Sequence, residues 1–129
     1  MASAQQTDHS SIEHNIVCLE EAHCPIPKFA IPNKYTSYAA TKREEVASRL
    51  RDATIAIVTI VPVTVEDLDQ CPRLKCVYVM ATGCELVDRE GFAQRGVTVI
   101  RAPQSNLTTV SEHALALYFA ARRRVCRHP

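Results

Sequence analysis

Two residues in the second half of the chain have the chemistry to recognise a small anion. Gly83 directly follows a strand-like run, and the absence of a Cβ lets neighbouring backbone N–H groups approach a carboxylate. A tight turn that needs a positive φ explains Gly83 equally well. Asn106, at the end of a polar loop, offers an amide donor to an anionic group, although loop ordering or helix capping is the commoner role of an isolated Asn.

Three other residues are reactive by type but poorly placed by sequence. Glu112 and His113 are adjacent, so on a helix their side chains point about 100° apart and an acid–base pair is disfavoured. We expect His113 to be structural, with its ring hydrogen-bonded at a packed helix edge. Cys84 has no base beside it in the sequence, so nucleophilic catalysis is not predicted. No catalytic residue is therefore assigned.

The cysteines indicate neither a disulfide framework nor a metal site. No two of the 6 cysteines have Cys-x2-Cys spacing, and no Cys/His set has zinc-finger spacing. We expect Cys18, Cys71 and Cys76 to act as small hydrophobic residues in or beside strands. Reduced thiols, together with the polar character of residues 1–11, predict a cytoplasmic protein without a signal peptide.

Length and charge limit the classes of function. A chain of 129 residues predicts one domain, and a net charge of +1 gives no indication of a nucleic-acid or membrane partner. Arg122 to Arg124 are interpreted as cations that suit the carboxyl end of a helix. The expected organisation is a disordered leader over 1–13, a single domain over 14–125 and a tail over 126–129.

The elements that must position these residues alternate along the chain. Short connections and right-handed crossovers predict a flavodoxin-like α/β fold, a doubly wound, mostly parallel five-stranded sheet of order 2-1-3-4-5. The second strand is expected at an edge. Strands are predicted over 15–19, 35–40, 54–60, 75–80 and 97–100, and helices over 41–52, from 64 past 68, over 88–96 and over 110–125.

Polar residues predict where these helices begin and end. Thr41 with Glu44 fits a capping box, and Thr64 and Asp88 are expected to cap the next two helices. Gly96 is expected to end the third helix as a C′ glycine. Thr108 or Thr109 is expected to cap the last helix, which is apolar nearly all round and therefore needs burial on more than one side.

Five short motifs resemble one enzyme family. They are Pro72-Arg-Leu-Lys75, Ala81-Thr-Gly83, Val87-Asp88, Arg95-Gly96-Val97 and Val110-Ser-Glu-His-Ala-Leu115. At this spacing they resemble the D-isomer-specific 2-hydroxyacid dehydrogenases, a family that includes formate, glycerate and phosphoglycerate dehydrogenases and glyoxylate reductases. The resemblance covers residues from about 15 to 124, which correspond to the substrate-binding, or catalytic, domain of that family.

The resemblance implies roles that the residues alone do not establish. The backbone at Thr82 and Gly83 would face a substrate carboxylate, and Asn106 would lie near the substrate. The last helix would cross to a nucleotide-binding domain, and NAD or NADP would be the cofactor. The family usually has Gly-x-Asp in the substrate loop, whereas this chain has Gly83-Cys84-Glu85.

The family's Gly-x-Gly-x-x-Gly cofactor loop and its catalytic Arg, Glu and His are absent from this sequence. We therefore expect a truncated substrate-binding half that is inactive alone. A stand-alone binding or regulatory module that self-associates through helix 110–125 is the alternative. A receiver-like signalling domain is a third possibility, with Glu20 and Glu21 as its acidic pair. Its third strand would have to end in an aspartate, but the strand ends Thr59-Ile60-Val61-Pro62, with no acid.

Overall fold

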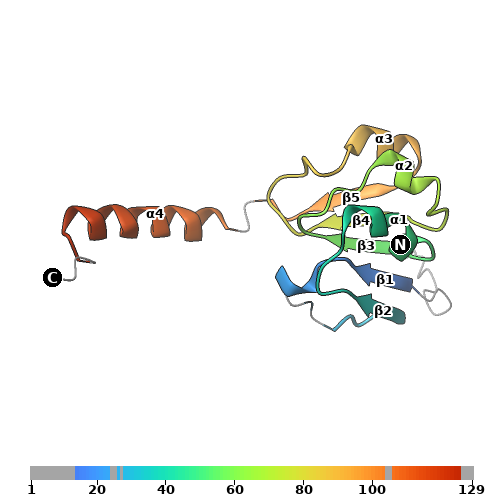
Figure 1. The fold of residues 1–129 in the computed structure, drawn as a ribbon, viewed down its shortest axis with the longest axis horizontal. Coiled ribbons are helices and arrows are strands. Elements are labelled where there is room, and N and C mark those ends of the chain that lie inside the picture. The colour runs from blue at the N-terminus through green and yellow to red at the C-terminus, as the bar shows by residue number, and fades with distance from the viewer. Residues whose placement is uncertain (1–13, 24–25, 27, 104–105, 126–129) are drawn as a thin grey trace, which may run out of the picture.

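Five parallel strands form one sheet in the computed structural model, which describes residues 14–23, 26, 28–103 and 106–125 (Figure 1). The strands lie in the order β2-β1-β3-β4-β5, and every neighbouring pair is parallel. The flavodoxin-like order and the five-stranded α/β fold predicted from sequence are confirmed, and β2 lies at an edge as expected. The strands are β1 (His14–Cys18), β2 (Asn33–Ser37), β3 (Ile55–Val58), β4 (Cys76–Val79) and β5 (Thr98–Arg101).

The helices that connect the strands are short, except for the last. They are α1 (Val46–Leu50), α2 (Val65–Leu68), α3 (Arg89–Gln94) and α4 (Leu107–Arg122), with 3-10 turns η1 (Glu21–His23) and η2 (Arg43–Glu45). The helix expected over 41–52 is thus a 3-10 turn followed by a short α-helix. In the part of the chain that the structure describes, no helix is long and apolar enough to cross a membrane.

Three of the predicted caps hold a helix end in place. The carboxylate of Asp88 accepts a hydrogen bond of 3.1 Å from the N–H of Gly91 at the start of α3. Gly96 has a φ of +72°, the left-handed conformation that a C′ glycine adopts. Thr64 is the N-cap residue of α2, and its N–H donates to the Asp67 carboxylate at 2.8 Å.

Two other predicted caps are wrong. Thr41 is not the N-cap residue, because the 3-10 turn that precedes α1 is capped at Lys42. The Thr41 hydroxyl instead donates to the carbonyl of Leu19, directly after β1, and accepts from Nη1 of Arg49. The N–H of Lys42 binds the Glu45 carboxylate instead, one residue later than predicted. Helix α4 begins at Leu107, before the threonines expected to cap it, with Asn106 as its N-cap residue and without a side-chain cap bond.

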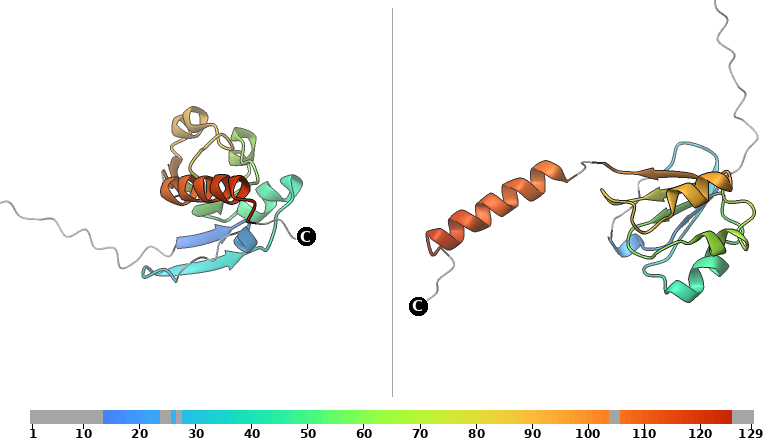
Figure 2. Two further views of the ribbon diagram at one scale, coloured as in Figure 1. Left: turned by 90° about the vertical axis from the view of Figure 1, so that its left-hand side faces the viewer. Right: turned by 90° about the horizontal axis from the view of Figure 1, so that it is seen from above.

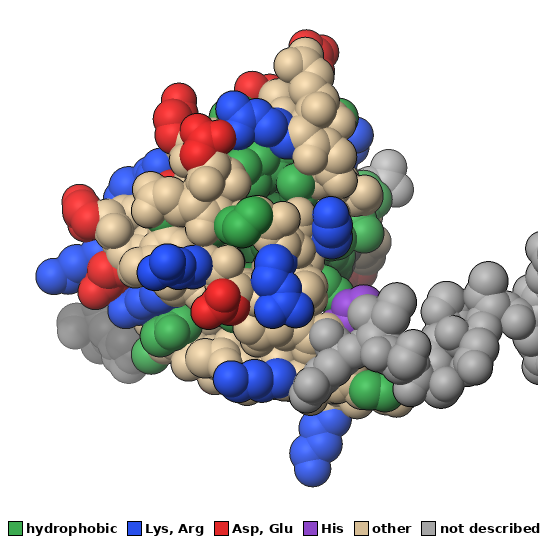
Figure 3. Space-filling model, turned by 90° about the vertical axis from the view of Figure 1, so that its right-hand side faces the viewer, with side chains coloured by type: hydrophobic (Ala, Val, Ile, Leu, Met, Phe, Trp, Pro, Cys, Tyr) green, Lys and Arg blue, Asp and Glu red, His purple; other side chains and the backbone are tan. Residues whose placement is uncertain are grey.

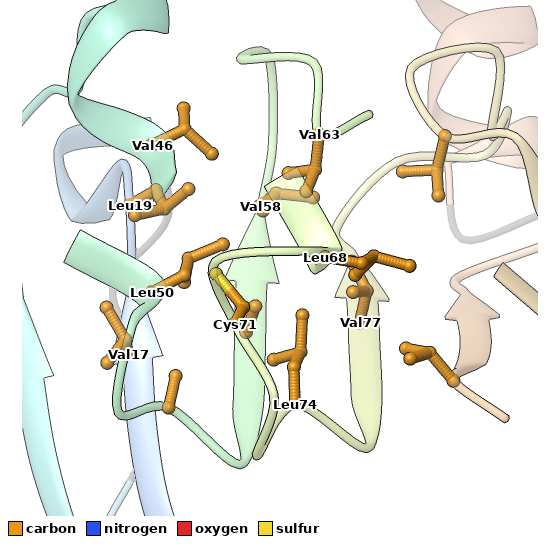
Figure 4. Close-up of a cluster of buried hydrophobic side chains, with 14 of the residues drawn as sticks. Val17, Leu19, Val46, Leu50, Val58, Val63, Leu68, Cys71, Leu74 and Val77 are labelled. Atoms are coloured by element: carbon orange, nitrogen blue, oxygen red, sulfur yellow. The ribbon is translucent and has the colours of Figure 1, made fainter. Parts of the chain in front are cut away.

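The main core lies between one face of the sheet and helices α1 to α3 (Figure 4). Successive side chains of a strand point to opposite faces, so alternate residues of the central strands meet the apolar stripes of the helices. The strands contribute Val17, Ala56, Val58, Val77 and Val79, and the helices contribute Val46, Leu50, Leu68 and Phe92.

The second face of the sheet has a smaller core. Ile16, Cys18 and Ile57 are buried there, and Ile26 and Phe29 from the segment before β2 pack against them. Among the described residues, this irregular segment takes the place of a helical layer. Burial also raises the pKa of the Cys18 thiol above its ordinary value, as expected of a cysteine that packs as a small hydrophobic residue.

Helix α4 leaves the body of the domain from the carboxyl end of β5 and extends away from the sheet (Figures 1 and 2). All of its residues are exposed except Ala120, which is half-buried. The burial that its apolar surface requires is not provided by any described part of this chain. Its exposed large hydrophobic residues are Leu107, Val110, Leu115, Leu117, Tyr118 and Phe119.

Candidate functional site

The carboxyl ends of the parallel strands meet at the edge of the sheet from which α4 departs (Figure 1). Ligands of open parallel sheets bind beyond this edge, in the loops that follow the strands. The described parts of these loops are residues 19–23, 38–42, 59–64, 80–86 and 102–103, followed by Asn106. Any site formed by this fold is therefore expected among them.

The backbone at Thr82 and Gly83 carries two adjacent donors that are free within the described structure. Neither N–H group makes a hydrogen bond to another described residue, and both residues are half-buried. Among the glycines, a positive φ occurs at Gly96 and not at Gly83. The alternative explanation of Gly83, a turn that needs a positive φ, is therefore wrong.

Strand β5 holds this loop on one side. The N–H of Ala102 donates to the carbonyl of Ala81 at 3.2 Å. Nη1 of Arg101 donates to the carbonyl of Thr82 at 2.6 Å. The carbonyl of the Thr82–Gly83 peptide is thus engaged by an arginine, which fixes the direction of that peptide plane and of its N–H group.

The loop after β3 holds the other side. The N–H of Val63 donates to the carbonyl of Leu86 at 3.2 Å, and Val63 and Val87 form an isolated parallel bridge. The N–H of Val87 closes a turn on the carbonyl of Cys84 at 3.1 Å. Gly83 therefore lies in a loop that is tied to both neighbouring strands.

Glu20 fixes the loop after β3 from within the domain. Its side chain is only 5% exposed. Its carboxylate accepts hydrogen bonds from the backbone N–H groups of Thr59, Ile60 and Val61 at 2.8, 2.7 and 2.9 Å. These three donors are thus unavailable to a ligand, and Glu20 cannot form half of an open acidic pair, as a receiver-like domain would require.

Glu85 lies over Gly83. A Cβ placed on Gly83 would be only 2.7 Å from Oε1 of Glu85, so the Glu85 side chain would have to move if residue 83 carried a side chain. Beside it lies a surface hollow of about 380 Å³, whose walls include Glu66, Glu85 and Asp88. Hydrogen bonding to the Thr64 side chain holds the pKa of Glu66 below its ordinary value.

The other residues considered from sequence do not join this loop. Asn106 is exposed at the start of α4, and no hydrogen bond between described residues links it to Thr82 or Gly83. His113 was expected at a packed helix edge with its ring hydrogen-bonded, but it is exposed on α4 and its ring bonds no described residue, because α4 does not pack on the domain. Glu112 is likewise exposed, and the described contacts bring no base to the half-buried Cys84.

Sequence reasoning missed Arg101 and the role of Glu20. Arg101 could have been noticed because it is a charged residue at the carboxyl end of the last predicted strand, where ligands of such sheets bind. For Glu20 the signal was a carboxylate directly after a buried apolar strand, where an ionised group needs partners.

The described residues do not fit a dinucleotide cofactor. A dinucleotide loop needs closely spaced glycines where a strand turns into a helix, so that backbone N–H groups meet the phosphates. Gly91 lies inside α3, Gly96 ends that helix, and a carboxylate covers Gly83. In the described ranges there is also no group of three or more His, Cys, Asp or Glu residues that could hold a metal ion.

The fold and this edge define a parallel α/β domain that presents its ligand-facing backbone beyond the carboxyl ends of its strands. The model of the D-isomer specific 2-hydroxyacid dehydrogenase catalytic domain matches residues 13–127. The chain belongs to this family.

The relatives are much longer than this chain. A glycerate dehydrogenase of Methylorubrum extorquens is 36% identical over 107 residues, which are 82% of this chain and 34% of that protein. A D-3-phosphoglycerate dehydrogenase of Mycobacterium bovis is 36% identical over 84 residues, 64% of this chain and 16% of that protein. A solved acyclic imino acid reductase, in complex with NADPH and D-Arg, has the same fold, with a TM-score of 0.70, 24% identity and coverage of 87% of this chain and 38% of that one.

Proposed function

We propose that this chain is the substrate-binding half of an NAD(P)-dependent oxidoreductase that acts on 2-hydroxy and 2-oxo acids. The observation that supports this most directly is the pair of adjacent backbone N–H groups at Thr82 and Gly83, free among the described residues at the ligand edge. Such groups bind a carboxylate through two hydrogen bonds and the local backbone dipoles. Membership of the family supports the same assignment.

Each residue of the proposed site has a distinct task. Thr82 and Gly83 hold the substrate carboxylate through their N–H groups. Asn106, at the start of α4, offers an amide to a polar group of the bound acid when the substrate bridges the two loops. The nicotinamide supplies hydride chemistry, and the described residues do not hold it, so this chain alone binds the acid but does not turn it over.

Helix α4 is proposed to run between this domain and a nucleotide-binding domain. Its apolar residues are exposed on all sides, including Leu117 at 58% and Phe119 at 56%. An interdomain helix contacts two bodies and therefore needs apolar residues on more than one face. The proposed location is a reducing compartment such as the cytoplasm, supported by the free thiols of Cys18, Cys71, Cys76 and Cys84.

Titration of the isotopically labelled chain with D-glycerate tests the proposal. The amide resonances of Thr82 and Gly83 should shift in a saturable way, whereas the uncharged methyl ester of the same acid should leave them unchanged. A folded protein whose Thr82 and Gly83 resonances do not respond to D-glycerate would contradict the proposed site. NADH-dependent reduction of glyoxylate by the purified chain would contradict the absence of turnover.

A stand-alone module that self-associates through α4 is the second candidate, and the exposed apolar helix is the observation that favours it. Size-exclusion chromatography with light scattering separates the two candidates. A monodisperse dimer that Leu117→Lys converts to a monomer would support the module. A monomer that aggregates with time would instead support the substrate-binding half, with α4 lacking its partner domain.

A further inference from the structure

The two edges of the sheet differ in how they are protected from pairing with another strand. Strand β2 forms one edge and β5 forms the other (Figure 1). The unpaired backbone groups of an edge strand can bind a further strand, and natural edges are usually guarded by proline or by charged side chains. The edge at β2 has both guards, because Pro32 directly precedes the strand and Lys34 is exposed within it.

Strand β5 leaves four backbone groups without a partner in the described structure. The N–H of Thr98 donates to the carbonyl of Lys75 at 2.9 Å, so it points towards β4. Successive residues of a paired strand direct their N–H and C=O groups to opposite sides, so those of Val99 and Arg101 point away from β4. No hydrogen bond between described residues involves these four groups. A further strand could therefore pair with them.

Neither a charge nor a described helix covers the edge at β5. The one charged residue of the strand, Arg101, donates from Nη1 to the carbonyl of Thr82 at 2.6 Å. Thr82 follows β4, so this bond draws the guanidinium away from the free edge. A surface hollow of about 710 Å³ lies beside the strand and is lined by Arg89 and Ala93 of α3 and by residues 96–99. The edge is therefore open to a second polypeptide.

An apolar row on the second face of the sheet ends at this edge. The cross-strand pairs Cys18–Ile57, Ile57–Tyr78 and Tyr78–Ile100 join four strands into one row. Cys18 and Ile57 are buried in the smaller core, whereas Ile100 is 46% exposed. Ile100 thus has an apolar cross-strand neighbour on the β4 side, and no described strand supplies one on the other side.

We propose that β5 is an interaction surface that pairs antiparallel with β5 of a second copy of this chain, about a two-fold axis at Ile100. Val99 of each copy then lies opposite Arg101 of the other and exchanges both backbone hydrogen bonds with it, which uses all the free groups of both strands. The two Ile100 residues form a non-hydrogen-bonded pair with Cα atoms about 4.5 Å apart, so each covers the other. The apolar row then continues from one sheet into the next.

Charge and size favour a weak pairing of identical copies. At this register Arg101 faces Val99 and not the second Arg101, and a net charge of +1 gives little repulsion between copies. Strand β5 has 4 residues. Its length is then about 13 Å, so the strands bury less than the roughly 800 Å² per partner of a standard interface. The main-chain bonds supply much of the affinity, and the dimer should depend on concentration.

Sedimentation equilibrium of the full chain carrying Leu117→Lys tests the pairing. This substitution weakens association through the exposed α4, so the association that remains reports on other surfaces. The average mass should rise with protein concentration from that of the monomer towards that of the dimer, and no further, because a two-fold pairing closes. A chain that stays monomeric up to millimolar concentration contradicts the proposal, as does growth beyond the dimer.

Two matched substitutions in this chain locate the interface. Ile100 and Ile31 are both 46% exposed, so neither Ile100→Lys nor Ile31→Lys should unfold the domain, which circular dichroism verifies. Ile100→Lys places two like charges opposite each other at the axis and should raise the Kd of the dimer about 10-fold. Ile31→Lys, beside β2 at the other edge, should leave the Kd unchanged. Equal dimerisation of the two variants would show that β5 is not the interface.

Hydrogen exchange at the backbone amides tests the register without a substitution in β5. The N–H groups of Val99 and Arg101 should exchange more slowly as the protein concentration rises, because pairing protects them. The N–H of Tyr35, which points away from β1 at the other edge, should exchange at the same rate throughout. Exchange at Val99 and Arg101 that does not depend on concentration would overturn the pairing even if the chain dimerises. None of these results bears on acid binding, so the proposed function is tested separately.

Discussion

Two phenylalanines in two helices of this chain lie in opposite environments. Phe92 in α3 is 0% exposed and packs into the core on the helical face of the sheet, whereas Phe119 in α4 is 56% exposed. The shorter helix, of 6 residues, is the one that is packed, and the helix of 16 residues is not. Apolar composition therefore shows that a helix needs burial but does not show what buries it.

The difference has an energetic consequence. Isolated helices shorter than about 12 to 15 residues are marginal in water, and most helical stability in proteins comes from packing of an apolar face. Helix α3 obtains that packing from the sheet. Helix α4 obtains no such packing from the described residues, so the stability of the domain should be almost independent of the side chains of α4.

The comparison is tested most strongly by truncating each phenylalanine. Phe92→Ala should lower the free energy of unfolding by about 3 to 5 kcal/mol, because it leaves a cavity in the core. Phe119→Ala should change it by less than about 0.5 kcal/mol, as is usual for an exposed position. Urea unfolding followed by circular dichroism measures both values. A large loss in Phe119→Ala would show that α4 is packed in solution, which would remove the contrast between the helices.

A second contrast separates a buried carboxylate from an exposed one. Glu20→Gln removes an ionised acceptor of three backbone N–H groups and should cost about 2 to 4 kcal/mol of unfolding free energy. Glu90→Gln, on the exposed surface of α3, is the matched control and should be nearly neutral. Equal effects of the two substitutions in urea unfolding would show that Glu20 does not hold the loop after β3.

A buried thiol in the core should make the free energy of unfolding depend on pH, with a smaller effect than the substitutions above. Burial raises the pKa of the Cys71 thiol from 9.0 to about 11. Between these values the unfolded thiol ionises while the folded one stays protonated, so its stabilising contribution is complete below about pH 9 and is lost as the pH rises towards 11. The loss should be about 1 to 2 kcal/mol.

Urea unfolding at pH 8 and pH 10.5 measures this loss. Cys71→Ala should reduce the dependence on pH, although it also lowers stability at both pH values. Cys84→Ala, at the loop outside the core cluster, should leave the dependence unchanged. A pH response that is identical in all three proteins would assign the effect to groups other than Cys71.

The face of the molecule opposite α4 gives a further contrast with the candidate site. Lys and Arg side chains are spread over that side, interspersed with carboxylates (Figure 3). At the carboxyl edge the described loops after β1, β3, β4 and β5 contain no Lys or Arg, although Arg101 is the last residue of β5 and Lys42 lies in the loop after β2. The net charge of +1 does not reveal that charged side chains are distributed differently on the two sides of the molecule. The distribution of charge around a site affects which acids bind there.

Local sequence patterns predicted much of the fold because they report local physics. The β-branched run at 55–58 became β3, and Asp88 and Gly96 ended α3 as their capping chemistry indicates. The cap at Thr41 was predicted wrongly because its hydroxyl bonds the carbonyl of Leu19, which is 22 residues away in sequence, and accepts from the Arg49 side chain instead of from a helix N–H. A side chain with both a local and a distant partner cannot be assigned from its neighbours alone.

The sequence by itself determined the order of the strands, the apolar faces that form the core and the family to which the chain belongs, because periodicity and short motifs encode these directly. Only the tertiary structure decided that Glu20 occupies the N–H groups after β3, that Arg101 engages Thr82 and that Glu85 covers Gly83. It also showed that α4 finds no packing surface in the described domain. The contacts of Glu20 and of Arg101 join residues that are far apart in the chain. The contact of Glu85 with Gly83 depends on the direction of the Glu85 side chain. No local pattern in the sequence specifies any of these.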